Sequence, residues 1–150
     1  MKKFFTLLSA AMITLTLSSF ANNSEPGKPV IKTFQENFPL ASNVIWSSKK
    51  NVHTASFVNN DRAQQAYYSA EGEYLGQVWQ VTLNETPENV RKEILKNATA
   101  SEIKSVSLFF QPEGYPKYLA VFERNGKRTI KEIDSYGRSS IVWKRRVPAI

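Results

Sequence analysis

The second half of the sequence matches the first half segment by segment, and this internal match limits the possible folds more than any other feature. Residues 41–44 match residues 100–103 at an offset of 59, and residues 53–57 match residues 118–122 at an offset of 65. The offset of 65 also joins 59–62 to 124–127 and 68–72 to 133–137. Trp79 and Trp143, at an offset of 64, close the two series. A chain that matches itself in this way is expected to build one supersecondary unit twice.

Each half is predicted to open with a helix. In the first half, apolar residues recur at helical spacing over 30–38, directly after Pro29, which suits a first helical position. In the second half, Thr86 is predicted to be the N-cap and Pro87 the first helical residue, with apolar residues on one face over 90–95.

Three or four short antiparallel strands are expected after each helix. Asn125-Gly126 is a strong hairpin signal because both residues tolerate positive φ, and Gly72 and Gly137 mark a second turn in each half. The change of offset from 59 to 65 indicates an insertion near residues 111–115. The predicted fold class is therefore α+β, a tandem helix-plus-antiparallel-strands repeat with the helices packed on one face of a sheet and the other face open.

The N-terminus has the pattern of a secretory signal peptide. Lys2 and Lys3 precede a mostly apolar run, and Ser19-Phe20-Ala21 supplies a cleavage site of the small-x-small type. The run is shorter than the ~20 residues that span a bilayer. We therefore predict a signal peptide at 1–21, cleaved after Ala21, a flexible leader at 22–29, and a single domain at 30–147 with repeats of about 30–85 and 86–147.

The sequence contains no cysteine, which restricts both chemistry and localisation. Disulfides, thiolate metal sites, a cysteine nucleophile and a lipid-anchored N-terminal cysteine are excluded. Together with the signal peptide, this predicts a periplasmic or secreted protein with no lipid anchor and no transmembrane segment after signal removal.

A fixed order of short motifs follows the first helix. The motifs are Phe38-Pro39, Ala41-x-x-Val44-x-Trp46, Ala55-x-Phe57 and Tyr68-x-x-x-Gly72. Their order resembles that of the secreted PepSY-like, beta-lactamase-inhibitor-like proteins, a family of small exported bacterial domains, over roughly residues 30–147. In the second half, Ala98-Thr99 replaces Phe-Pro, and Val106 or Ser105 stands near the place of Trp46. The resemblance implies a tandem α/β repeat and a binding function.

Two segments match Ser-x-x-Lys, the pattern in which a lysine activates a serine nucleophile. They are Ser47 with Lys50 and Ser101 with Lys104. The mechanism needs its serine at the start of a buried helix, whereas Ser47 follows a strand-like segment. A hydrolase using Ser47 and Lys50 is therefore the least favoured function.

The other candidate catalytic or metal-binding residues have simpler interpretations. His53, the only histidine, matches Tyr118 in the second half, so a packing role is favoured over proton transfer. Glu71 and Glu73 flank a turn glycine and are expected to reach solvent, whereas glycosidase carboxylates need an enclosed site. Asp61 and Asp134 lie in separate loops. We expect no enzyme, no cofactor and no metal.

The net charge of +7 is concentrated in the second half. Residues 22–85 carry a net charge of −1 and residues 86–150 one of +6, with a basic run at 144–146. This favours an alternative function, an envelope structural or anionic-polymer-binding protein that uses the basic second half. Nucleic acid is disfavoured by the predicted compartment, and lysines and arginines also protect edge strands from aggregation.

Exposed aromatic residues are the most informative binding candidates. Tyr68 is expected to point inward and its neighbour Tyr67 outward, while Trp79 and Trp143 are expected at equivalent places. The predicted binding residues are Tyr67, Tyr74, Trp79, Tyr136, Trp143, Lys144 and Arg146. The favoured function is an exported, non-catalytic binding domain, protein-binding or inhibitor-like, whose open sheet face contacts another envelope or secreted protein.

Overall fold

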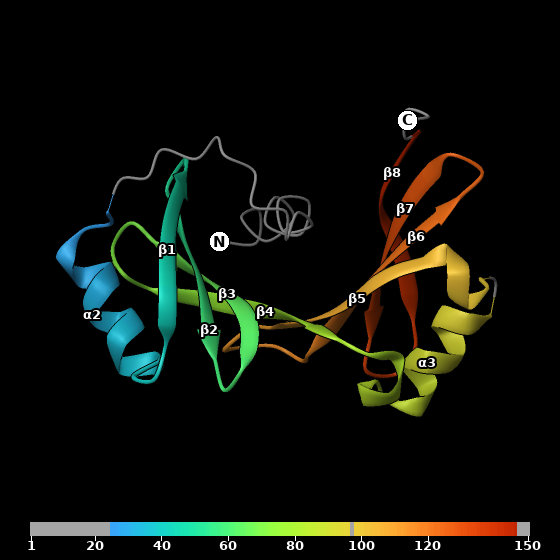
Figure 1. The fold of residues 1–150 in the computed structure, drawn as a ribbon, viewed down its shortest axis with the longest axis horizontal. Helices are drawn as coiled ribbons and strands as arrows, with labels where there is room; N and C mark the ends of the chain where they lie inside the picture. The colour runs from blue at the N-terminus through green and yellow to red at the C-terminus, as the bar shows by residue number, and fades with distance from the viewer. Residues whose placement is uncertain (1–24, 97, 147–150) are drawn as a thin grey trace. The chain divides into compact units, whose positions relative to one another are not determined.

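The computed structural model describes residues 25–96 and 98–146. Over these residues the chain is an α+β protein with two α-helices and eight antiparallel strands, which confirms the α+β class of the predicted fold (Figure 1). The predicted signal peptide, its cleavage site and residues 22–24 of the predicted leader lie outside the described residues, as does Val147. The last two residues of the predicted leader, Lys28 and Pro29, already belong to the first helix. Within the described ranges, no helix is long and apolar enough to cross a membrane.

The described chain divides into two compact units, with one boundary between Trp79 and Gln80 and with residues 110–114 grouped with the first unit. We refer to α2 and β1–β4 as the first half and to α3 and β5–β8 as the second half. The first half comprises α2 (Lys28–Asn37), β1 (Ser42–Lys49), β2 (Val52–Asn59), β3 (Arg62–Ser69) and β4 (Tyr74–Val81). The second comprises α3 (Glu88–Leu95), β5 (Ile103–Phe110), β6 (Lys117–Arg124), β7 (Lys127–Asp134) and β8 (Ser139–Arg146), with short 3-10 helices at Leu83–Glu85 and Ala100–Glu102.

The first half has an aromatic core. Phe34 of α2 packs edge-on against Phe57 and Trp46, with ring centroids 5.0 Å and 5.2 Å away. Ala55, Phe57, Ala66 and Tyr68 belong to this buried cluster, so they mark the side of β2 and β3 that contacts the helix. Burial raises the pKa of the Tyr68 hydroxyl to about 12.

The second half combines buried aliphatic residues with ionic contacts. Val90 and Ile94 of α3 are buried, as are Ala120 and Ile133 on β6 and β7. Glu93, on the same helix, accepts a hydrogen bond from the Ser139 hydroxyl at 2.6 Å.

Several predicted details of the strand ladders are confirmed. His53 lies opposite Tyr68 as Tyr118 lies opposite Ile133, so the offset of 65 is correct for these strands. Val106 lies opposite Ala120 as Trp46 lies opposite Ala55, so Val106, not Ser105, takes the place of Trp46. The predicted insertion is also present, because two residues join β1 to β2 and six join β5 to β6.

The start of the second helix differs from the prediction. Pro87 is the N-cap, and its carbonyl oxygen accepts a hydrogen bond from the Arg91 amide at 2.9 Å. The Thr86 hydroxyl instead donates to the carbonyl oxygen of Leu83 at 2.6 Å. The Thr86 side chain, which the sequence pattern predicted to cap the helix, therefore bonds within the preceding 3-10 turn instead.

Candidate protein-binding groove

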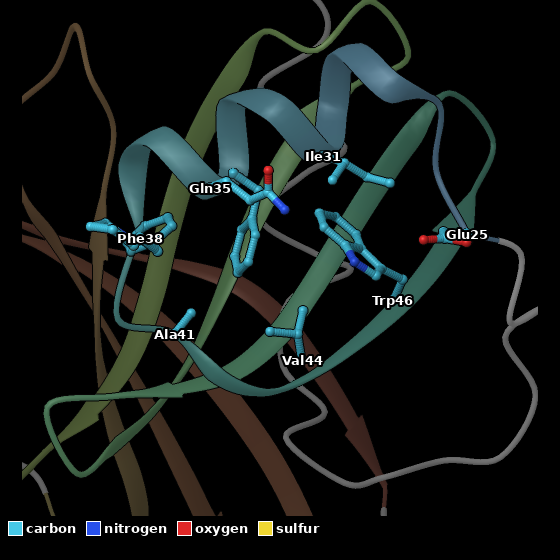
Figure 2. A pocket seen from close by; sticks show the side chains of 9 residues that line it. Glu25, Ile31, Gln35, Phe38, Ala41, Val44 and Trp46 are labelled. Carbon is cyan, nitrogen blue, oxygen red and sulfur yellow. The ribbon is translucent and has the colours of Figure 1, made fainter.

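A groove of about 580 Å³ lies between α2 and β1 (Figure 2). It forms because the helix must end at Phe38, since Pro39 disfavours helical backbone in the residue before it. The chain then turns back and enters β1 beneath the helix. The lining residues are Glu25, Ile31, Phe34, Gln35, Phe38, Pro39, Ala41, Val44 and Trp46.

The aromatic core supports the floor of the groove. Trp46 is half-buried between α2 and β1 and contacts Phe34. Phe34 is also in ring contact with Phe38, with centroids 5.5 Å apart. Since buried aromatic rings are fixed by several neighbours, this floor is apolar and preformed.

The outer side of the groove is an edge strand with exposed apolar side chains. Among the described strands, β1 is first in the sheet order and pairs only with β2. Its register shifts between Ser42 and Ile45, where Asn43 has a φ of 54°. Ile45, where regular pairing resumes, is 51% exposed. Such a strand offers unpaired backbone groups beside an apolar surface.

A serine and the histidine meet at the far end of β1, a contact that the sequence reasoning missed. Ser48 lies opposite His53, and its hydroxyl oxygen is 2.7 Å from His53 Nδ1. The two-residue turn Lys50-Asn51, with Lys50 at a φ of 56°, is the signal that would have placed them opposite each other. Hydrolytic use of such a pair also needs a group that orients the histidine. No carboxylate hydrogen bonds to His53 within the described part of the chain.

The predicted hydrolase pair is not brought together. Ser47 lies in β1 opposite Thr54, and Lys50 follows in the turn. In the described ranges no hydrogen bond joins these two residues, and no group of three or more acidic or histidine side chains is placed to hold a metal ion.

The prediction that Tyr67 is exposed is wrong. Tyr67 is only 5% exposed, although it lies on the side of β3 opposite Ala66 and Tyr68. Its hydroxyl donates to Gln65 Oε1 at 2.9 Å, and burial raises the pKa of this hydroxyl above its ordinary value. Tyr74 is half-buried against the aromatic core, 5.6 Å from the Tyr68 ring. Neither tyrosine is a free side chain on an open face.

The predicted equivalence of Trp79 and Trp143 is also wrong. Trp79 lies opposite Gln64, on the side of the sheet that α2 contacts, whereas Trp143 lies opposite Ile130. At the offset of 65, Trp79 corresponds to Lys144 and Trp143 to Val78. A one-residue difference in register moves a side chain to the other face, so the two indoles point in opposite senses within their own halves.

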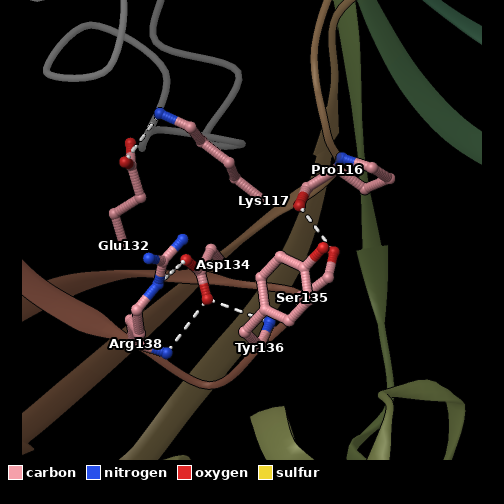
Figure 3. Close-up of polar contacts among 7 residues, drawn as sticks. All are labelled: Pro116, Lys117, Glu132, Asp134, Ser135, Tyr136 and Arg138. Carbon is pink, nitrogen blue, oxygen red and sulfur yellow. Dashed lines mark hydrogen bonds and ion pairs between the residues drawn. The ribbon is translucent and has the colours of Figure 1, made fainter.

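Tyr136 is the predicted aromatic residue that the structure leaves most exposed, at 65%. A compact turn between β7 and β8 presents it (Figure 3). One Asp134 oxygen accepts hydrogen bonds from the Tyr136 and Arg138 amides at 2.9 and 3.0 Å, and the other accepts from Arg138 Nε at 2.6 Å. The Ser135 hydroxyl donates to the Pro116 carbonyl at 3.1 Å and ties the turn to the loop before β6.

The remaining predicted residues, Lys144 and Arg146, are exposed on β8, the last strand in the sheet order. They share this strand with Trp143, whereas Tyr67 belongs to β3 and Tyr74 and Trp79 to β4. The predicted residues are therefore divided between the two halves of the chain. The groove between α2 and β1 was not predicted, because its exposed apolar residues give no sequence signal apart from the helix end at Phe38-Pro39.

Neither a protein-family model nor a curated protein sequence matches this chain. Solved structures do match it. A DUF2874 family protein of Bacteroides ovatus has a TM-score of 0.72 and 16% identity, and the match covers 82% of this chain and 89% of that one. A BLIP-like protein of Bacteroides fragilis has a TM-score of 0.69 and 16% identity, with coverage of 84% and 89%.

A third structure, from Bacteroides eggerthii, is provisionally assigned to the periplasm. Its TM-score is 0.73 at 16% identity, with coverage of 82% of this chain and 90% of that one. The chain has a BLIP-like fold. The resemblance to beta-lactamase-inhibitor-like proteins is thus confirmed for the fold.

Proposed function

We propose that this protein is an exported, non-catalytic binding domain that captures an extended segment of another envelope or secreted protein along β1. The observation that carries the proposal is the edge strand β1, which places Val44 and the half-buried Trp46 in the groove under α2 and the half-exposed Ile45 on its opposite face. Because Tyr67 is buried, the proposed binding site is the edge strand β1 and not the open sheet face that the sequence predicted.

An added strand would use both features of this edge. Its backbone would pair with the outer side of β1, most readily over the regular stretch from Ile45 to Lys49. Alternate side chains of a strand point to the same face, so every second residue of the bound segment would enter the groove above Trp46. The expected ligand is therefore an extended segment with apolar residues at alternate positions.

Export and protein binding have further support. The N-terminal pattern of Lys2 and Lys3, an apolar run and Ala21 favours cleavage and passage to the periplasm or the medium. One structural neighbour is provisionally assigned to the periplasm and another is BLIP-like. We also interpret the common order of one helix and four strands in the two halves as a tandem repeat.

The test compares two exposed isoleucines on strands at the ends of the sheet order. Ile45 on β1 is 51% exposed and Ile141 on β8 is 56% exposed. Peptides would be selected from a displayed library on the purified domain without residues 1–21, and their dissociation constants measured by fluorescence anisotropy. Ile45 lies opposite Ser56, on the face of β1 turned away from the groove, where it would contact the other side chains of the added strand. Ile45→Asp should therefore weaken binding about tenfold or more, because a charge would replace that apolar contact. Ile141→Asp should leave binding unchanged.

Backbone amide shifts locate the bound peptide independently of the variants. Saturating peptide should move the resonances of residues 42–49 and of α2, and thermal unfolding should verify that both variants are folded. The proposal fails if the selected peptides bind Ile45→Asp as tightly as wild type, or if their shifts map to β8. A library that yields no binder also counts against it.

A further inference from the structure

One end of the second half carries an unusual arrangement of positive charges. Across β6, β7 and β8, Arg124 lies opposite Lys127, and Lys127 lies opposite Arg146. On the other face, Arg128 lies opposite Arg145. The basic corner is defined here as Arg124, Lys127, Arg128, Lys144, Arg145 and Arg146.

These pairings oppose folding. Directly opposite side chains in neighbouring antiparallel strands are ~5 Å apart, and like charges at that distance are destabilising. Two of the six cations are neutralised, since Arg124 pairs with Glu102 and Arg128 with Glu123, both at 3.0 Å. Among the described residues the other four, Lys127, Lys144, Arg145 and Arg146, have no ion pair.

Protection of an edge strand explains only part of this arrangement. Lysines and arginines on β8 would discourage pairing with another chain. The same argument does not explain Lys127 and Arg128, which lie on β7 between two paired strands. Repulsion across β7 and β8 is relieved if an anionic ligand joins the cations.

We propose that the basic corner binds a flexible, linear, phosphate-bearing polymer. Lys127 and Arg146 project from one face of β7 and β8 and Arg128 and Arg145 from the other, so the charges surround the edge strand. A flexible chain reaches both faces, whereas a flat membrane meets one face at a time. Phosphate oxygens point in several directions and accept bidentate hydrogen bonds from arginine, so one polymer can engage cations on both sides. This site belongs to the second half alone and does not depend on the β1 groove.

The experiment uses fluorescently labelled inorganic polyphosphate and the protein without residues 1–21, with binding followed by anisotropy over a series of salt concentrations. The double variant Lys127→Gln with Arg146→Gln should weaken binding about tenfold or more, and should reduce the slope of log affinity against log salt by about two. The control Lys49→Gln with Lys50→Gln removes the same charge from two exposed neighbours in the first half, and should change affinity less than twofold.

A stability measurement separates binding from a structural role. The Lys127 and Arg146 double variant should unfold at the same or a higher denaturant concentration than wild type, because it removes a repulsive pair. Equal loss of affinity in the Lys49 and Lys50 control would overturn the proposal, since binding would then follow net charge alone. Polyglutamate that binds as tightly as polyphosphate at matched charge, or anionic vesicles that bind more tightly, would overturn it as well.

Discussion

The two halves have the same order of elements, but different interactions hold the helix against the strands. In the first half an aromatic cluster does so, centred on Phe34. In the second half the position of Phe34 belongs to Ile94, at an offset of 60, and the neighbouring Glu93 pairs with Lys131 at 3.5 Å. The first-half residues that correspond to Glu93, Lys131 and Ser139 are Thr33, Ala66 and Tyr74.

This difference accounts for where each half offers a binding surface. Large rings in the first half fill the space under α2 and leave Trp46 of the edge strand β1 half-buried, at the floor of the groove. In the second half Val106 replaces Trp46, and the charged side chains form ion pairs or accumulate in the basic corner. The same backbone arrangement thus supports apolar contacts in one half and electrostatic contacts in the other.

Truncation of the corresponding helix residues Phe34 and Ile94 should reveal the largest difference in stability between the two halves. Phe34→Ala should lower the free energy of unfolding by about 3–5 kcal/mol, because it removes a ring that contacts four other aromatic rings. Ile94→Ala should cost less, about 2–3 kcal/mol. Urea unfolding measures both.

The matched control for this pair is one helical turn earlier. Val30 and Val90 are both fully buried and correspond at the offset of 60. Val30→Ala and Val90→Ala should each cost about 2 kcal/mol. If Phe34→Ala proves no more destabilising than Ile94→Ala, the aromatic cluster is not the main support of the first half.

Local sequence signals predicted the elements, and long-range packing decided the rest. The helices at 30–38 and 90–95, the hairpin at Asn125-Gly126 and the insertion after β5 all follow from short segments whose backbone preferences are strong. The burial of Tyr67 could not be read in this way, because strand alternation gives a side chain's face but not what covers that face.

The candidate sites were harder to predict for a related reason. The two tryptophans were matched by residue type at an offset of 64, whereas the ladder has an offset of 65, and one residue reverses the face. The groove depends on how α2 lies over β1, and the Ser48–His53 contact depends on hairpin register. The basic residues of β8 were recognised, but their opposition to Lys127 and Arg128 required the strand pairing.

Two turn glycines test whether the halves share one contact despite their different cores. Gly72 and Gly137 have φ of 91° and 84°, and a Cβ on either would come within 2.9 Å of backbone at the start of the helix, at Pro29 and Asn89 respectively. Gly72→Ala and Gly137→Ala should each destabilise the protein by about 2 kcal/mol, through backbone strain and displacement of the helix start. Gly114→Ala, in a loop where the nearest contact is an ordinary 3.6 Å, should change stability by about 0.5 kcal/mol at most. Unequal costs at Gly72 and Gly137 in thermal unfolding would show that only one half depends on this contact.

The smallest effect concerns pH and is specific to the second half. The hydrogen bond from Ser139 holds the pKa of the Glu93 carboxyl below its ordinary value of 4.5, and the nearby Lys131 and Lys96 act in the same direction against its partial burial. A carboxyl whose folded pKa is lowered contributes stability above its unfolded pKa, and this contribution is lost as the pH falls through the folded pKa.

Glu93→Gln keeps an acceptor for Ser139 but no charge, so it should cost about 1 kcal/mol at neutral pH and make unfolding less dependent on pH below 4.5. Urea titrations from neutral to acid pH measure this, with the exposed Glu113→Gln expected to follow the wild-type curve. Amide hydrogen exchange should show the acid-dependent loss of protection in α3 and β7 and not in α2, because Thr33 and Ala66 carry no charge at the corresponding positions. An equal loss of protection in both helices would mean that Glu93 does not distinguish the halves.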